Sequence, residues 1–162
     1  MIYTTPKLIR FQHCDPAGIV FYPQYFHLLH EVQEDFLTHI GFPEHELIQQ
    51  GFGLPIVDLK TRFTGMCRHG DHIEIAWRLS RVGQASIAMH YEITGPARPG
   101  DSGREVKLVA DAVVVFMRLL EGKAVEIPDA LRLALLPYAE PAEPSEPSEP
   151  SEAPHAAENS TA

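Results

Sequence analysis

Hydrophobic positions between residues 23 and 40 recur every three or four residues. The apolar stripe consists of Tyr25, Leu29, Val32, Phe36 and Ile40. Polar side chains keep the same spacing on the opposite face, at His27, Glu31, Glu34 and Thr38. This period predicts a long amphipathic α-helix that buries one face against a core. Pro23 suits the first helical position, and Gly41 followed by Pro43 ends the helix.

Most of the remaining apolar residues alternate with polar ones, which is the period of a half-buried β-strand. The predicted strands are 3–12, 57–63, 73–79, 87–93 and 109–117. A short helical or irregular piece is predicted at 44–50, and a short helix at 128–136. The order is strand, long helix, four strands and short helix, with short links between consecutive strands. This order predicts an α+β fold in which one antiparallel sheet packs on the long helix.

The last part of the chain differs in composition from the rest. It repeats Glu-Pro-Ser, carries six glutamates without any Lys or Arg, and lacks large apolar residues. Such a segment cannot offset the entropy cost of ordering. We therefore predict a single domain at residues 1–138, followed by a disordered acidic tail at 139–162. Because the tail holds most of the net charge of −9, the domain itself is only weakly acidic.

Composition excludes several classes of function. No cluster of Lys and Arg suggests a nucleic-acid partner. No apolar run approaches the ~20 residues that span a bilayer, so no membrane association is expected. The first residues lack the basic start and apolar run of a secretion signal, which predicts a cytoplasmic protein. The two cysteines, Cys14 and Cys67, lack the spacing of a zinc site and are expected to be reduced.

Candidate chemistry is concentrated in the loop at residues 13–20, which leads into the long helix. Asp15 is the only acidic residue between Met1 and Glu31. A carboxylate is ionised at neutral pH and can attack an acyl carbon or remove a proton from water. The helix start offers unpaired N–H groups for a developing oxyanion. The candidate donors are the N–H groups of Tyr22, Gln24 and Tyr25, because Pro23 has none.

Each of these residues also has a plainer interpretation. Asp-Pro commonly starts a turn, so the residues alone favour a turn or capping role for Asp15. His30 lies at the edge of the apolar stripe, and Gln33 lies within it. Each side chain is either buried and hydrogen-bonded or faces a substrate pocket. The helical spacing of His27, His30, Glu31 and Glu34 could suit a metal, but nothing in the sequence completes such a site. No metal is therefore expected.

The run CDPAGIVFYPQYF resembles the signature of the 4-hydroxybenzoyl-CoA thioesterase family of the Pseudomonas type. The similarity continues through the helix, GLPIVDLKTRF, the Gly70-Asp71 pair and EIPDAL, and covers residues 9–136. Pro23 separates this branch from related short-chain acyl-CoA thioesterases, which typically carry His at that position. The resemblance implies a hotdog fold, in which a five-stranded antiparallel sheet wraps around a long central helix.

The resemblance also implies a function and a set of roles. Asp15 would be the catalytic nucleophile or general base, and the Tyr22 N–H would polarise the thioester carbonyl. The substrate would be an acyl-CoA, favouring a benzoyl or hydroxybenzoyl group, with no cofactor and with a homodimer or homotetramer as the working form. The alternatives are a short-chain acyl-CoA thioesterase and a non-catalytic hotdog module that binds CoA or acyl-carrier ligands.

The expected substrate-binding residues are Gly18, Tyr25, His30 and Arg81. Gly18 allows close approach of a ligand to the backbone. His30 stands where the 4-hydroxybenzoyl enzymes carry an Asp that contacts the phenol, which leaves the acyl group open. Arg81 is the only charge in the hairpin where those enzymes have a basic cluster for the CoA phosphates. Three other arginines could replace it in this role, namely Arg62, Arg68 and Arg78.

Overall fold

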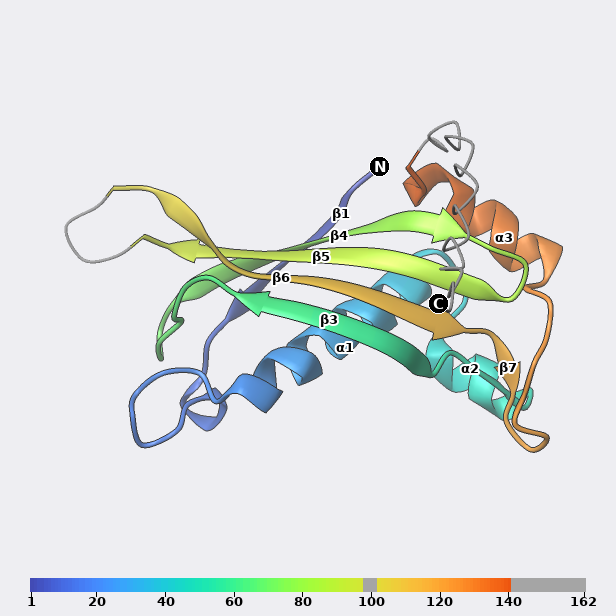
Figure 1. The fold of residues 1–162 in the computed structure, drawn as a ribbon, viewed down its shortest axis with the longest axis horizontal. Helices are drawn as coiled ribbons and strands as arrows, with labels where there is room; N and C mark the ends of the chain where they lie inside the picture. The colour runs from blue at the N-terminus through green and yellow to red at the C-terminus, as the bar shows by residue number, and fades with distance from the viewer. Residues whose placement is uncertain (98–101, 141–162) are drawn as a thin grey trace, which may run out of the picture.

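Five strands form one antiparallel sheet in the order β1-β4-β5-β6-β3 (Figure 1). The structure, a computed structural model, describes residues 1–97 and 102–140. The strands are β1 (Tyr3–Leu8), β3 (Ile56–Phe63), β4 (His72–Val82), β5 (Ser86–Pro96) and β6 (Arg104–Val115). A small second sheet joins β2 (Phe52–Gly53), β7 (Met117–Arg118) and β8 (Lys123–Ala124).

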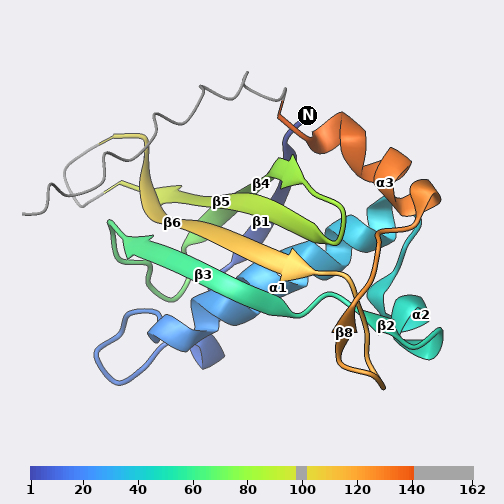
Figure 2. The same ribbon diagram turned by 45° about the vertical axis from the view of Figure 1, so that its right-hand side comes forward.

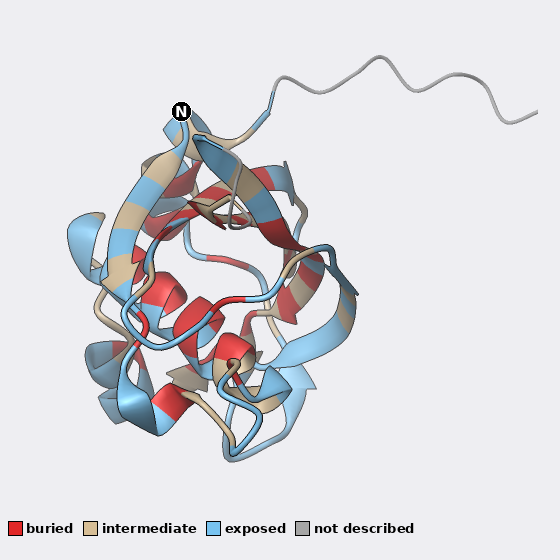
Figure 3. Ribbon diagram, turned by 90° about the vertical axis from the view of Figure 1, so that its left-hand side faces the viewer, coloured by how far each residue is buried: buried red, intermediate tan, exposed pale blue. Residues whose placement is uncertain are grey.

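Helix α1 (Tyr22–His39) crosses one face of the large sheet, and the core lies between them (Figures 1 and 2). Alternate residues of β4 and β5 are buried, as the period of two requires. On α1 the buried positions follow the predicted stripe, and Phe36 lies against Trp77 with ring centroids 3.9 Å apart. Buried residues line the space enclosed by the helix and the sheet (Figure 3). The predicted α+β fold is confirmed.

Several boundaries differ from the sequence-based prediction: β4 and β5 are longer than predicted, β6 begins at Arg104 and ends at Val115 in place of 109–117, and two further differences lie next to the candidate site. The first strand ends at Leu8, because the chain then leaves β4 and forms a 3₁₀ turn at Phe11–His13. Helix α1 begins at Tyr22, so Pro23 is the second helical residue instead of the first. The second position suits Pro equally well, because the first N–H groups of a helix have no intrahelical partner. Tyr22 thereby becomes the first helical residue.

The short helices are α2 (Glu44–Gln49) and α3 (Asp129–Leu135), which agree with the predictions at 44–50 and 128–136. A 3₁₀ turn at Leu136–Tyr138 follows α3. Glu140 then pairs with Arg78 at 2.9 Å, and Ala139 bridges to Leu79. The chain thus stays on β4 for two residues past the predicted domain boundary. The rest of the predicted tail, 141–162, lies outside the described residues.

Strand β3 lies at the edge of the sheet and is only partly covered by α1. Its apolar residues Ile56, Val57 and Phe63 are 47%, 61% and 48% exposed. The alternation of β3 is therefore correct, but its apolar side chains do not enter the core as those of β4 do. Within the described residues, no helix is long and apolar enough to cross a bilayer.

Candidate active site

The loop between β1 and α1 is a tight turn fastened at its base. The Gly18 N–H donates to the Asp15 carbonyl at 2.9 Å, and the Asp15 N–H donates to the Ile19 carbonyl at 3.1 Å. Gly18 has φ +76°, a conformation that side-chain-bearing residues rarely adopt. Isolated bridges join Cys14 to Val20 and Ile19 to Arg68. The loop that follows β3 therefore holds the turn in place.

Asp15 is half-buried at the start of this turn. Its Oδ1 accepts a hydrogen bond from the Ala17 N–H at 2.8 Å, which closes an Asx turn. Its Oδ2 has no hydrogen-bond partner within residues 1–97 and 102–140. The carboxylate therefore fills the turn-forming role with one oxygen and keeps the other available for chemistry. The two interpretations of Asp15 do not exclude each other.

The start of α1, which follows this turn in the chain, offers one free donor. The Gln24 N–H donates to the Phe21 carbonyl at 2.8 Å, which removes Gln24 from the candidates. Tyr25 is the fourth helical residue and lies past the unpaired N–H groups. The Tyr22 N–H, at the positive end of the helix dipole, makes no hydrogen bond within the described part of the chain. Tyr22 is thus the donor that remains.

The Tyr25 side chain lies beneath the loop and is only 4% exposed. Its ring centroid is 5.7 Å from that of Phe63, and its hydroxyl hydrogen-bonds Cys67. Burial raises the pKa of the Tyr25 phenol and the pKa of the Cys67 thiol. The thiol therefore stays protonated and is no nucleophile at neutral pH. Tyr25 was expected to bind substrate, but its side chain is not open to a ligand here.

His13 stabilises the base of the loop. The Arg10 N–H donates to His13 Nδ1 at 3.0 Å, and the Phe21 N–H donates to the His13 carbonyl at 2.9 Å. His13 is buried, and this burial lowers the pKa of its imidazole. A neutral ring with an occupied Nδ1 suits a structural role. Cys14 and Asp15 do not form a catalytic triad with His13. This was expected, because adjacent residues cannot converge on one another as triad members must.

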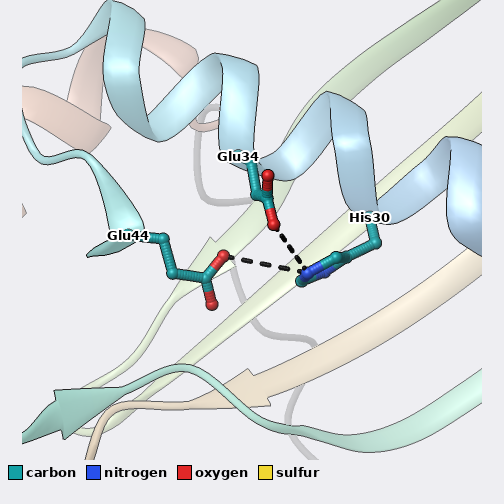
Figure 4. A group of neighbouring side chains, drawn as sticks. All are labelled: His30, Glu34 and Glu44. Atoms are coloured by element: carbon teal, nitrogen blue, oxygen red, sulfur yellow. Dashed lines mark ion pairs between the residues drawn. The ribbon is translucent and has the colours of Figure 1, made fainter. Parts of the chain in front are cut away.

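His30 lies two turns of helix beyond Tyr22, where α1 meets α2 (Figure 4). Its Nε2 is 3.0 Å from Glu34 Oε1 and 4.0 Å from Glu44 Oε2. The sequence analysis singled out His30 and Glu34 but missed Glu44. A cavity of about 390 Å³ opens beside this cluster, and its walls are mostly apolar. His30 is half-exposed, so it is not the buried, hydrogen-bonded imidazole of the plainer interpretation.

The histidine and acidic residues of α1 divide into two groups. Glu31 pairs with Lys7 at 2.9 Å, and His27 is exposed. His30, Glu34 and Glu44 instead bring their ligand atoms within 4.8 Å of one another. Glu44 supplies the third ligand-type side chain that the sequence did not reveal. The expectation that no metal binds remains a prediction.

The predicted phosphate-binding arginines are widely spaced. Arg81 is exposed near the end of β4, whereas the Asp15 turn adjoins the strand's start through Arg68 and Asp71. A strand rises about 3.3 Å per residue, so roughly 30 Å separates Arg81 from the loop of the same chain (Figure 1). Arg78 is already paired with Glu140. Arg81 is therefore not brought to Asp15 within one chain.

A further cavity borders the segment between β3 and β4, which holds the Asp15 turn in place. It holds about 440 Å³, and Arg68, Asp71 and Lys107 contribute polar groups to its wall. Lys107 is only 3% exposed, and its Nζ lies 2.8 Å from Glu105 Oε1. Gly65 and Gly95 make room for its side chain, since a Cβ at either would crowd it. No pattern in the sequence distinguished this buried lysine.

Comparisons with known proteins find similarity to thioesterases. The model of the thioesterase-like superfamily matches residues 9–135. A 4-hydroxybenzoyl-CoA thioesterase from Pseudomonas sp. (strain CBS-3) is 28% identical over 133 residues, covering 77% of this chain and 91% of that protein. A solved gentisyl-coenzyme A thioesterase is 28% identical with TM-score 0.69, over 83% of this chain and 99% of that one. A dynemicin thioesterase is 25% identical with TM-score 0.76, over 88% and 100%.

Proposed function

The chain belongs to the thioesterase-like superfamily, and we propose that it hydrolyses an aromatic acyl-CoA to the free acid and CoA. One observation carries this proposal most directly. The Asp15 turn presents a carboxylate oxygen that has no hydrogen-bond partner among the described residues, and the free Tyr22 N–H follows seven residues later at the start of α1. Hydrolysis of a thioester needs these two groups together, an oxygen base or nucleophile and a donor for the oxyanion.

Asp15 and Tyr22 divide the reaction between them in this proposal. Asp15 Oδ2 either attacks the carbonyl carbon, giving a mixed anhydride that water then cleaves, or takes a proton from the attacking water. In both routes the carbonyl oxygen accepts a hydrogen bond from the Tyr22 N–H while the negative charge develops on it. The C–S bond breaks, and CoA leaves as the thiol after protonation. The hydrogen bond from Ala17 to Oδ1 fixes the carboxylate in one orientation.

The aromatic substrate class rests on the site and on the relatives. Relatives are named for 4-hydroxybenzoyl-CoA and gentisyl-CoA, both hydroxylated aromatic thioesters. Eight residues of α1 separate Tyr22 from His30, about 12 Å along the helix. We propose that the acyl ring runs along this face of α1 toward His30, with Gly18 admitting the thioester end. The buried Tyr25 side chain, held by its hydrogen bond to Cys67, would pack under the thioester end of the substrate.

We propose that the working form is a homodimer or homotetramer. The uncovered apolar residues of β3 suit the interface, because an exposed edge strand can pair with a second copy. A shared site also gives Arg81 a role, since it lies far from the Asp15 of its own chain. Arg68, which carries no recorded ion pair in the described residues, is the alternative for the CoA phosphates.

Thiol release from a panel of CoA esters tests the proposed function. Benzoyl-CoA and hydroxybenzoyl-CoA are expected to have the highest kcat/KM, at least tenfold above acetyl-CoA and palmitoyl-CoA. An aromatic ring that fills an apolar pocket provides this margin, because each buried methylene is worth roughly a tenfold preference or more. A preference for acetyl-CoA would favour the short-chain alternative. An inert but folded and oligomeric protein would favour the binding-module alternative.

Replacing Val57 by Lys is expected to convert the oligomer to a smaller species in size-exclusion chromatography with light scattering. The charge would lie at the centre of the proposed β3 interface, where it would lose its water. The control is Leu120→Lys, which changes an apolar residue that is 97% exposed and lies between β7 and β8, outside the five-stranded sheet. An unchanged mass for Val57→Lys would remove β3 from the interface.

A further inference from the structure

Three side chains converge where α1 meets α2, namely His30, Glu34 and Glu44 (Figure 4). His30 and Glu34 lie one helical turn apart on α1, and Glu44 is the first residue of α2. Each offers a nitrogen or oxygen atom that can bind a cation, and these atoms all lie within 4.8 Å of one another. Two carboxylates and one imidazole therefore share one small space between two helices.

The two carboxylates of this cluster lack a counter-charge from a basic side chain. Among residues 1–97 and 102–140, neither Glu34 nor Glu44 forms an ion pair with Lys or Arg. Glu31, elsewhere on α1, is paired with Lys7 at 2.9 Å. Like charges at such short range repel, and a protonated His30 balances only one of them. The cluster therefore keeps at least one uncompensated negative charge.

Glu44 is the member of the cluster that most lacks a partner. Its Oε2 is buried and makes no hydrogen bond to any described residue. His30 Nε2 lies 4.0 Å from this oxygen, too far for a hydrogen bond, and is already 3.0 Å from Glu34 Oε1. An acid is favoured in the first turn of a helix, but an exposed carboxylate there also interacts with the helix dipole, so this preference does not explain the burial. A buried acceptor without a partner is unfavourable and calls for a ligand.

The distances within the cluster match those between two ligands of one metal ion. Zn–N and Zn–O bonds of about 2.0–2.2 Å place two ligands of the same ion roughly 3–4.3 Å apart. The separations of His30 Nε2 from Glu34 Oε1 and from Glu44 Oε2, 3.0 and 4.0 Å, both lie in this range. The longer gap, which no hydrogen bond spans, thus fits two bonds to a shared ion. His30 and Glu34 are half-exposed, so an ion can enter from solvent and keep water as a further ligand.

We propose that His30, Glu34 and Glu44 bind a divalent first-row cation such as Zn²⁺. One imidazole and two carboxylates suit such an ion, whereas Ca²⁺ and Mg²⁺ prefer oxygen ligands alone. The ion fastens α2 to α1 and neutralises the two carboxylates. The sequence predicted no metal because it showed nothing that completes a site on α1, and Glu44 is the ligand that completes it. The proposal concerns binding and stability, and it is independent of the proposed function.

The test uses the full-length protein without an affinity tag, stripped of metal with EDTA and then dialysed. Isothermal titration with ZnCl₂ is expected to show one equivalent bound per chain. Zn²⁺ at a hundred times its Kd is expected to raise the Tm of the wild type by about 5–10 °C, because a ligand that binds only the folded state stabilises that state.

Glu44→Gln removes the charge of the proposed ligand and keeps the shape of its side chain. This variant is expected to bind Zn²⁺ at least about a hundredfold more weakly, since the loss of even an outer-shell partner costs 10–100-fold. In EDTA it should be at least as stable as the wild type, because a buried charge is gone, so a loss of binding is not a loss of fold. Glu46→Gln is the matched control. It makes the same change on the same helix, at an exposed carboxylate outside the cluster, and should bind Zn²⁺ as the wild type does.

Two results would overturn the proposal. A wild type that binds no Zn²⁺ in the titration would show that the cluster holds no such cation. An unchanged affinity and Tm response in Glu44→Gln would assign the bound Zn²⁺ to exposed histidines elsewhere, such as His27 or His45. Loss of both responses in Glu44→Gln, with both retained in Glu46→Gln, assigns the ion to the three converging side chains.

Discussion

Asp15→Asn is expected to lower kcat for the preferred aromatic acyl-CoA by roughly 10²–10⁴-fold, the range of a lost general base or nucleophile. The fold should stay intact, because an Asn side-chain carbonyl can still accept the Ala17 hydrogen bond that closes the turn. The substitution removes the negative charge and the free basic oxygen at nearly constant shape. Steady-state kinetics and thermal unfolding measured on the same preparation separate the loss of chemistry from a loss of stability.

The control for this substitution is Asp71→Asn. Asp71 also holds a turn, because its Oδ2 accepts the Arg68 N–H at 2.8 Å, and it lies on the neighbouring loop. We expect kcat within a few-fold of the wild type for this variant, since its carboxylate has no assigned role in catalysis. Near-normal turnover of Asp15→Asn would eliminate Asp15 as nucleophile and as base. Acid quench of a single turnover with a labelled acyl group then distinguishes the two roles, because only the nucleophile retains the label.

The helix and the strands of the large sheet were predictable because their signal is local. Hydrophobic spacing along α1 and β4 depends only on neighbours in sequence, and the structure buries those faces. The end of β1 was not predictable in this way. Residues 9–12 have strand-like composition, but the chain must turn away from β4 to reach α1, and His13 fixes that turn. Tertiary context overrides propensity at this point.

The candidate site was predictable only in part, for a related reason. Asp15, Gly18 and Tyr22 lie within eight residues of each other, so a single motif contains the proposed chemistry. Glu44 comes to His30 only because the chain reverses after Gly41 and starts α2. That contact joins two elements and leaves no periodic trace in the sequence. Arg81 shows the opposite error. An arginine is a suitable residue type for binding CoA phosphates, but Arg81 lies at the far end of a strand eleven residues long, away from the Asp15 of its own chain.

Tyr22→Pro tests the oxyanion donor without changing a side chain that touches the reacting atoms. Proline removes the Tyr22 N–H and is favoured at the first turn of a helix. The preceding residue, Phe21, already has φ −67° and ψ 124°, the extended conformation that a following proline requires. Tyr22 is also 59% exposed, so the fold should tolerate the change. We expect kcat to fall by about 10²–10³-fold, the cost of losing one such donor in a hydrolase.

The proline also removes the Tyr22 ring, which contacts Phe21 and Phe26 with centroids 5.3 and 6.4 Å away. Tyr22→Ala is the matched control, because it removes the same ring and keeps the N–H. If the N–H stabilises the oxyanion, Tyr22→Ala should change mainly KM, whereas Tyr22→Pro should change mainly kcat. Equal kinetic defects in both variants would assign the effect to the ring. The thioester oxygen would then need another donor, and the free N–H at the start of α1 would have no part in catalysis.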